Sequence, residues 1–157
     1  MSTVALRTEE VYEVLCEVLQ KNEIEYEKTE GLFVVCSVSG QDGDIRMTFC
    51  TDVSKMLITL YSPMVTHIPE ESLTDASLAV CMLNHRLQDG AFCLDLSRGM
   101  LYFRMTYSYY NSEPNEDIFS YMLSHTAEVV ENYRKKIIGL CMPSYKSGKL
   151  KVESGIF

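Results

Sequence analysis

The sequence lacks the features that identify membrane, secreted and nucleic-acid-binding proteins. No stretch approaches the run of about twenty apolar residues that a membrane-spanning helix needs. The segment from Met1 to Arg7 has no basic region followed by an apolar run, so no signal peptide is expected. Lys and Arg number 14 against 22 Asp and Glu, and a net charge of −8 disfavours binding to a phosphate backbone. These absences predict a cytoplasmic protein with no membrane and no nucleic-acid partner.

Recognisable catalytic, cofactor and metal motifs are also missing. No Gly-x-Ser-x-Gly sequence is present to hold a nucleophilic serine, and the segment 39–44 has neither the lysine of a phosphate-binding loop nor the length of a calcium loop. Cys81 and His85 stand four residues apart on a predicted helix, with Cys93 soon after, but no fourth zinc ligand is evident. The sequence therefore predicts no enzyme, no cofactor and no metal site. Two alternatives stay open: a small enzyme whose Cys–His site is assembled by folding, and a dimeric regulator that senses a small ligand.

The cysteines do not form the dense pattern of a disulfide-stapled protein. There are six in 157 residues, at positions 16, 36, 50, 81, 93 and 141, mostly within apolar segments. Disulfide scaffolds are usually shorter and richer in turns, so this spacing predicts buried, reduced thiols.

What the sequence does contain is the composition of an ordinary folded domain. Hydrophobic residues make up 46% and charged residues 23% of a chain long enough to bury a core. No internal repeat or domain linker is visible. We therefore predict one domain over residues 1–142 and a flexible tail over 143–157, a segment with three lysines and two glycines.

The periodicity of the apolar residues predicts an α+β fold. A first helix is expected to be capped by Thr8, and strands are expected over 32–38, 45–49 and 56–60. The segment between Pro63 and Pro69 is predicted to be a linker. A second helix over about 70–88 would be capped by Gly90, strands over 91–96 and 101–105 would form a hairpin, and a last helix would run from Pro114 to near Pro143. The predicted order is helix, three-stranded antiparallel meander, helix, β-hairpin, helix.

The middle of the chain resembles a known family. Leu83-Asn84 lies late in the second predicted helix, and the hairpin reads Gly90-Ala91-Phe92-Cys93-Leu94-Asp95, then Gly99, then Leu101-Tyr102-Phe103-Arg104. In this arrangement, and in its element order, the chain is similar to the YbjN-like family, whose fold is shared with the chaperones of type III secretion. The resemblance implies an antiparallel sheet with helices packed on it, frequent dimerisation, and the binding of polypeptide rather than catalysis.

The hairpin and the tyrosines after it are the predicted binding surface. A sheet with helices on one face leaves another face or an edge on which a partner can dock, and tyrosines are enriched at such surfaces. Alternation along the strands does not say which face is open. The predicted function is a non-enzymatic, homodimeric polypeptide-binding adaptor or regulator, and its acidic surface favours a basic or amphipathic partner. The candidate partner-binding residues are Phe92, Leu94, Leu101, Phe103, Tyr107, Tyr109 and Tyr110.

Overall fold

The elements follow the predicted order, with one strand more than expected. A computed structural model describes residues 3–112 and 115–141. The elements are α1 (Thr3–Lys21), β1 (Tyr26–Thr29), β2 (Phe33–Val38), β3 (Ile45–Asp52), β4 (Leu57–Val65), the 3₁₀ turn η1 (Glu70–Ser72), α2 (Leu73–Asn84), β5 (Ala91–Asp95), β6 (Met100–Ser108) and α3 (Glu116–Cys141).

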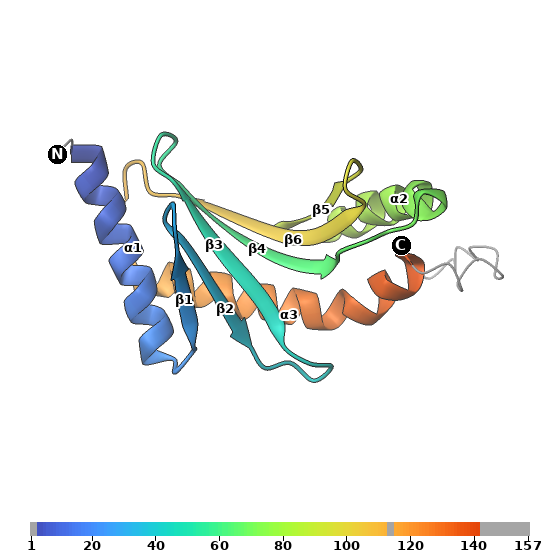
Figure 1. Cartoon of the computed structure of the whole chain (residues 1–157), viewed down its shortest axis with the longest axis horizontal. Coiled ribbons are helices and arrows are strands. Elements are labelled where there is room, and N and C mark those ends of the chain that lie inside the picture. The colour runs from blue at the N-terminus through green and yellow to red at the C-terminus, as the bar shows by residue number, and fades with distance from the viewer. Residues whose placement is uncertain (1–2, 113–114, 142–157) are drawn as a thin grey trace.

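The six strands form one antiparallel sheet in the order β1-β2-β3-β4-β6-β5 (Figure 1). The first four strands follow one another as a meander, because their connections are too short for crossovers. The hairpin of β5 and β6 then joins β4 through β6. The α+β class is confirmed, and the predicted meander and hairpin are parts of one sheet.

The helices lie on one side of this sheet, and the core fills the space between the two layers (Figure 1). Helix α3 runs beneath β3, β4 and β6, while α2 lies against β5 and α1 packs on α3 near the β1 end. Aromatic pairs join the layers: Phe49 of β3 meets Phe119 of α3 at 6.4 Å between ring centroids, and Phe92 of β5 meets Tyr133 of α3 at 5.5 Å.

The additional strand, β1, escaped prediction because it is short and polar. Only Tyr26 of its four residues is aromatic or apolar. Its register with β2 pairs Tyr26 with Cys36, and Lys28, which pairs with Val34, lies over the ring of Tyr12 in α1 at 5.3 Å. A strand at the edge of a sheet needs no hydrophobic alternation, so charged residues are tolerated there.

Helix α1 begins earlier than predicted, at Thr3, so Thr8 is an interior residue and does not cap the helix. The hydroxyl of Thr8 is buried and lies 3.1 Å from the hydroxyl of Tyr109. The side chain of Thr8, which was expected to cap the helix, instead connects α1 to the segment that follows β6.

Two further boundaries differ from the predictions. Strand β4 continues through Pro63 to Val65, where a linker was expected. Its pairing with β3 ends at Tyr61, so the missing N–H of Pro63 interrupts no bond on that side, and the register with β6 shifts between Pro63 and Val65. Helix α2 ends at Asn84, four residues short of the predicted end, because the side chain of Asn84 is engaged by β5.

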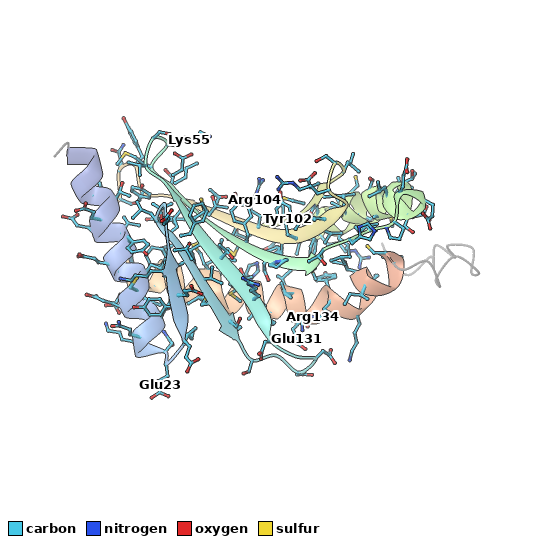
Figure 2. The ribbon with its side chains drawn as sticks, viewed as in Figure 1. Glu23, Lys55, Tyr102, Arg104, Glu131 and Arg134 are labelled. Carbon is cyan, nitrogen blue, oxygen red and sulfur yellow. The ribbon has the colours of Figure 1, made fainter. Side chains whose placement is uncertain are left out.

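A polar contact fixes the β2–β3 turn to α3. The guanidinium of Arg134 donates hydrogen bonds to the carbonyls of Asp42, Gly43 and Asp44 at 2.8–3.2 Å, and a carboxylate oxygen of Glu131 accepts one from the Asp42 N–H at 3.3 Å (Figure 2). This contact holds one end of β2 and β3 to the helical layer. The predicted tail over 143–157 lies outside the described residues, so its flexibility stays a prediction.

Candidate binding surface

One face of the sheet carries none of the helices that the structure describes (Figure 1). Residues that alternate with the core positions of each strand point away from the helical layer, because neighbouring side chains in a strand lie on opposite faces. We call this surface the uncovered face. Its central residues are Val35 and Ser37 of β2, Arg46, Thr48 and Cys50 of β3, Thr59, Tyr61 and Pro63 of β4, Ala91 and Cys93 of β5, and Tyr102, Arg104 and Thr106 of β6.

Two rows of cross-strand neighbours form the middle of the uncovered face. The register places Val35, Thr48, Tyr61, Arg104 and Ala91 side by side across five strands. The adjacent row joins Pro63, Tyr102 and Cys93. The rows meet where the rings of Tyr61 and Tyr102 contact edge to face, with centroids 5.7 Å apart. Such aromatic pairs combine apolar area with a polar hydroxyl, which suits a surface that binds another chain.

The structure divides the predicted site residues between the core and the surface. Phe92, Leu101, Phe103 and Tyr109 are 0–2% exposed and lie in the core. Phe103 contacts Phe92 at 5.5 Å and His125 of α3 at 6.3 Å, which places this pair of rings on the face that the helices cover. These residues are not accessible to a partner in this fold.

The remaining three predicted residues are at least partly accessible. Leu94 and Tyr107 are half-buried and pack against the core, and the hydroxyl of Tyr107 lies 2.6 Å from that of Ser112. Tyr110 is 64% exposed in the loop after β6. The arginines and tyrosines of the uncovered face were not among the predicted binding residues. Tyr102 and Arg104 nevertheless alternate with Leu101 and Phe103, which were predicted.

The Leu83-Asn84 motif has a structural explanation. The side-chain amide of Asn84 donates to the carbonyl of Phe92 at 2.9 Å, and its oxygen accepts the Phe92 N–H at 2.7 Å. The amide thereby replaces one residue of a neighbouring strand and occupies the outer edge of β5. Gly90 follows with a positive φ of 70°, and a side chain there would collide with the ring of Phe103. The motif joins α2 to the hairpin.

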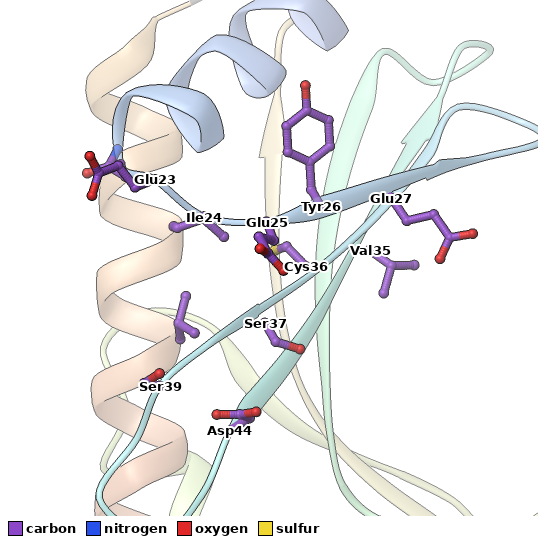
Figure 3. A pocket seen from close by; sticks show the side chains of 12 residues that line it. Glu23, Ile24, Glu25, Tyr26, Glu27, Val35, Cys36, Ser37, Ser39 and Asp44 are labelled. Atoms are coloured by element: carbon purple, nitrogen blue, oxygen red, sulfur yellow. The ribbon is translucent and has the colours of Figure 1, made fainter.

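The opposite edge of the sheet is formed by β1, which pairs with only the first part of β2. Beside it lies an open hollow of about 750 Å³, next to Ser37 and Val38, where β2 extends past β1 (Figure 3). Carboxylates surround this hollow, from Glu23, Glu25 and Glu27 on one side and Asp44 on the other. Charged side chains at an edge disfavour the nonspecific addition of a strand from another chain.

Helix α2 presents a second apolar surface to solvent. Leu78 is 59% exposed and Met82 is 39% exposed, and the thiol of Cys81 lies in an exposed position between them. The opposite side of the helix buries Ala76 and Leu83. A helix with apolar residues on both sides is typical of one that is buried in an assembly.

Four of the six thiols do not have the chemistry of a nucleophilic site. Burial raises the pKa of Cys36 to about 11, and burial also raises the pKa of Cys50, Cys93 and Cys141. Reactive cysteines have a lowered pKa, because the thiolate is the nucleophile. Within residues 3–112 and 115–141 no group of three potential metal ligands is found, and no helix there is long and apolar enough to cross a membrane.

Solved structures share this fold. A chain of the crystal structure of the ExsC–ExsE complex superposes with a TM-score of 0.58 at 15% sequence identity, covering 83% of this chain and 95% of that one. A chain of the HopA1–SchA chaperone–effector complex gives a TM-score of 0.56 at 14% identity, covering 80% and 94%. A comparison with curated protein sequences finds no significant match.

The sequence itself matches a protein family over most of its length. The match extends over residues 12–138 and thus includes the sheet, the second half of α1 and nearly all of α3. The family carries the description "Putative bacterial sensory transduction regulator". The resemblance inferred from Asn84 and the hairpin is thereby confirmed, and the chain belongs to the YbjN family.

Proposed function

We propose that the protein is a non-enzymatic polypeptide-binding protein, an adaptor or chaperone-like regulator, which docks an extended segment of a partner on the uncovered face. The observation that carries this proposal is a six-stranded sheet with helices on one side only and a paired Tyr61 and Tyr102 at the centre of the other. A patch of this kind is a common docking surface for another protein.

The comparisons support a polypeptide ligand. One neighbour in fold is named as part of a chaperone–effector complex, and a family of sensory transduction regulators is expected to act through protein contacts. The raised pKa values of the Cys36 and Cys93 thiols favour this hypothesis over a small enzyme that uses either of them in a Cys–His site. A cytoplasmic location stays a prediction of the sequence.

The face is a better candidate than either edge. Asn84 already occupies the backbone of Phe92 at the β5 edge, and carboxylates line the hollow at the β1 edge. By contrast, the uncovered face is a broad surface that extends across the side chains of β2, β3, β4 and β6.

Selection of random peptides on the purified protein tests this assignment. Peptides from a phage-displayed library should bind wild type, and Tyr102→Ala should weaken the binding of the selected peptides at least about tenfold, because a central aromatic anchor is lost. Tyr110→Ala is the matched control, since Tyr110 is exposed but lies outside the face. Affinity that falls for Tyr110→Ala and not for Tyr102→Ala would move the site to the loop after β6 and contradict the proposal.

We further propose that two copies associate through α2. Leu78, Cys81 and Met82 form an exposed apolar stripe, and a two-fold axis would place the same stripe of a second copy against it. Docking of a partner on the uncovered face leaves α2 free for this contact, because α2 lies on the other side of the sheet.

Light scattering on the purified protein, with and without a reducing agent, tests the dimer. We expect a dimer that survives reduction, and a monomer for Leu78→Glu, because a charge would be buried at the contact. Leu96→Glu is the matched control: Leu96 is 60% exposed, nearly the same as Leu78 at 59%, but lies next to the β5–β6 turn. A wild-type monomer, or dissociation by both substitutions alike, would contradict the assignment to α2.

A further inference from the structure

Two arginines on the uncovered face have side chains without an ion pair or hydrogen bond, although most cations among residues 3–112 and 115–141 are paired. Lys21, Lys55, Arg98 and Lys135 form ion pairs. Arg134 binds carbonyls, Arg7 binds the carbonyls after β6, and Lys28 lies over a tyrosine ring. In the described part of the chain, the side chains of Arg46 and Arg104 make no ion pair and no hydrogen bond, a condition they share with the side chain of Lys136 on α3.

The two arginines flank the aromatic centre of the face. Arg104 stands beside Tyr61 in the cross-strand row and next to Tyr102 along β6 (Figure 2). Arg46 lies on β3, on the far side of β4, two residues along from Thr48, the neighbour of Tyr61. Strands are spaced about 4.8 Å apart, so the two backbones are roughly 10 Å apart across the sheet. Both guanidinium groups therefore border the same apolar area.

The acids of this face lie at its margins and not among its central residues. Glu27 pairs with Val35 at the β1 edge, and Asp44 lies two residues before Arg46 beside the hollow at that edge. Asp52 is bound by Ser54 and by Lys55 at 3.6 Å, and Asp95 is bound by Ser97 and by Arg98. Side-chain and backbone hydrogen bonds lower the pKa of both carboxyl groups, so they are charged and already occupied by local partners. Among the central residues of the uncovered face, the charged side chains are those of Arg46 and Arg104, so the centre is positive within a chain of net charge −8.

From the two arginines beside the aromatic pair we infer that the partner segment is acidic, and that its carboxylates are bound by Arg46 and Arg104. The inference rests on the proposed docking at the uncovered face. Carboxylates form strong, often bidentate hydrogen bonds with arginine, and aromatic or aliphatic residues between them would pack on Tyr61 and Tyr102. In an extended segment, alternate side chains on one side are about 6.6 Å apart, so acids two to four residues apart suit the two guanidinium groups.

Neither a second copy nor the remaining sequence fits this surface as well. A two-fold axis through the centre of the face would place its two arginines against those of the second copy, and like charges would meet there. Residues 142–157 carry Lys146, Lys149 and Lys151 against the single acid Glu153. The acidic balance of the whole chain led us to expect a basic or amphipathic partner, and the local charge of the face points to an acidic one.

Fluorescence anisotropy with three synthetic peptides tests the inference on the full-length protein. The peptides share their length and their valine, threonine and tyrosine residues, and differ in carrying glutamate, glutamine or lysine at the same spaced positions. The glutamate peptide should bind about tenfold more tightly than the glutamine peptide, and added salt should reduce this advantage. The lysine peptide should bind most weakly.

Substitutions then assign the preference to the arginines. Arg104→Gln and Arg46→Gln should each lower the affinity for the glutamate peptide about tenfold and leave the glutamine peptide unchanged. Arg98→Gln is the control, because it removes the same charge from an exposed turn outside the centre of the face. Equal effects of all three substitutions would overturn the inference, since net charge alone would explain them.

Other outcomes separate this inference from the proposed function. Equal binding of the three peptides, lost in Tyr102→Ala, would overturn the acidic preference and leave docking on the face intact. Tighter binding of the lysine peptide than of the glutamate peptide would also overturn the acidic preference and leave docking on the face intact. If Arg104→Gln changes the oligomeric state in light scattering, the face is covered by a second copy and the inference is wrong. Docking itself fails only if peptides selected from the library ignore Tyr102.

Discussion

The two faces of the sheet are built from the same strands, yet they differ in almost every property. Along β6, Leu101, Phe103 and Met105 are 0–4% exposed, while Tyr102 and Arg104 between them point to the uncovered side. One face is hydrophobic and closed by α3, and the other is aromatic and cationic. A strand of this kind can therefore serve stability with the residues on one side and binding with the residues that alternate with them.

The largest contrast is expected from Phe103→Ala on the covered face. Phe103 is fully buried between Phe92 and His125, so its removal leaves a cavity and should lower the free energy of unfolding by about 3–5 kcal/mol. Urea unfolding followed by circular dichroism measures the change. A loss below about 1 kcal/mol would mean that the covered face is not the core.

A smaller loss of stability is expected where α2 is attached to β5. Asn84→Ala removes both hydrogen bonds to the backbone of Phe92 and should lower the free energy of unfolding by about 1–3 kcal/mol. Asn84→Asp keeps the acceptor but loses the donor, and should fall between Asn84→Ala and wild type. Hydrogen exchange of the Phe92 amide should accelerate in Asn84→Ala. Unchanged exchange would show that this edge of β5 is protected by something else.

Alkaline pH should act on the covered face through Cys36. Burial raises its pKa from 9.0 to about 11, so the folded state favours the neutral thiol. Its contribution to stability is fully present below pH 9 and is lost as the pH rises through about 11. The free energy of unfolding of wild type should fall more steeply over this range than that of Cys36→Ala. Parallel pH profiles for the two proteins would contradict this account of the thiol.

The smallest effects on stability are expected on the uncovered face. Arg104→Ala removes an exposed side chain without an ion pair or hydrogen bond in the described structure, and should change the free energy of unfolding by no more than about 0.5 kcal/mol. The same urea experiment provides the measurement. Destabilisation comparable to that of Phe103→Ala would erase the distinction between the faces.

Periodicity was sufficient to predict most of the fold. The spacing of Val11, Leu15 and Val18 indicated α1, and alternation indicated β2, β3 and the hairpin, because these elements bury one continuous stripe or face each. Strand β1 was missed because an edge strand of four mostly polar residues carries no such signal. The end of α2 was missed because it depends on the contact of Asn84 with Phe92, which lies eight residues later in the next strand.

The candidate surface was much harder to predict than the fold. Alternation separates Phe103 from Arg104, but only the position of α3 decides which of them is buried. Hydrophobicity drew attention to Phe92 and Phe103, although large aromatic residues in a strand are as typical of a core. The unpaired state of Arg46 and Arg104 depends on all other side chains nearby, so no local pattern reveals it.

Methyl NMR on neighbouring valines tests the central claim most directly. Val34 is fully buried on the covered face, and Val35, the next residue of β2, lies on the uncovered face. A protein with labelled valine methyl groups is titrated with a peptide selected from the library. We predict that the Val35 methyl signals shift and that those of Val34 stay in place. Shifts at Val34, or at Val80 of α2, without any at Val35 would contradict binding on the uncovered face.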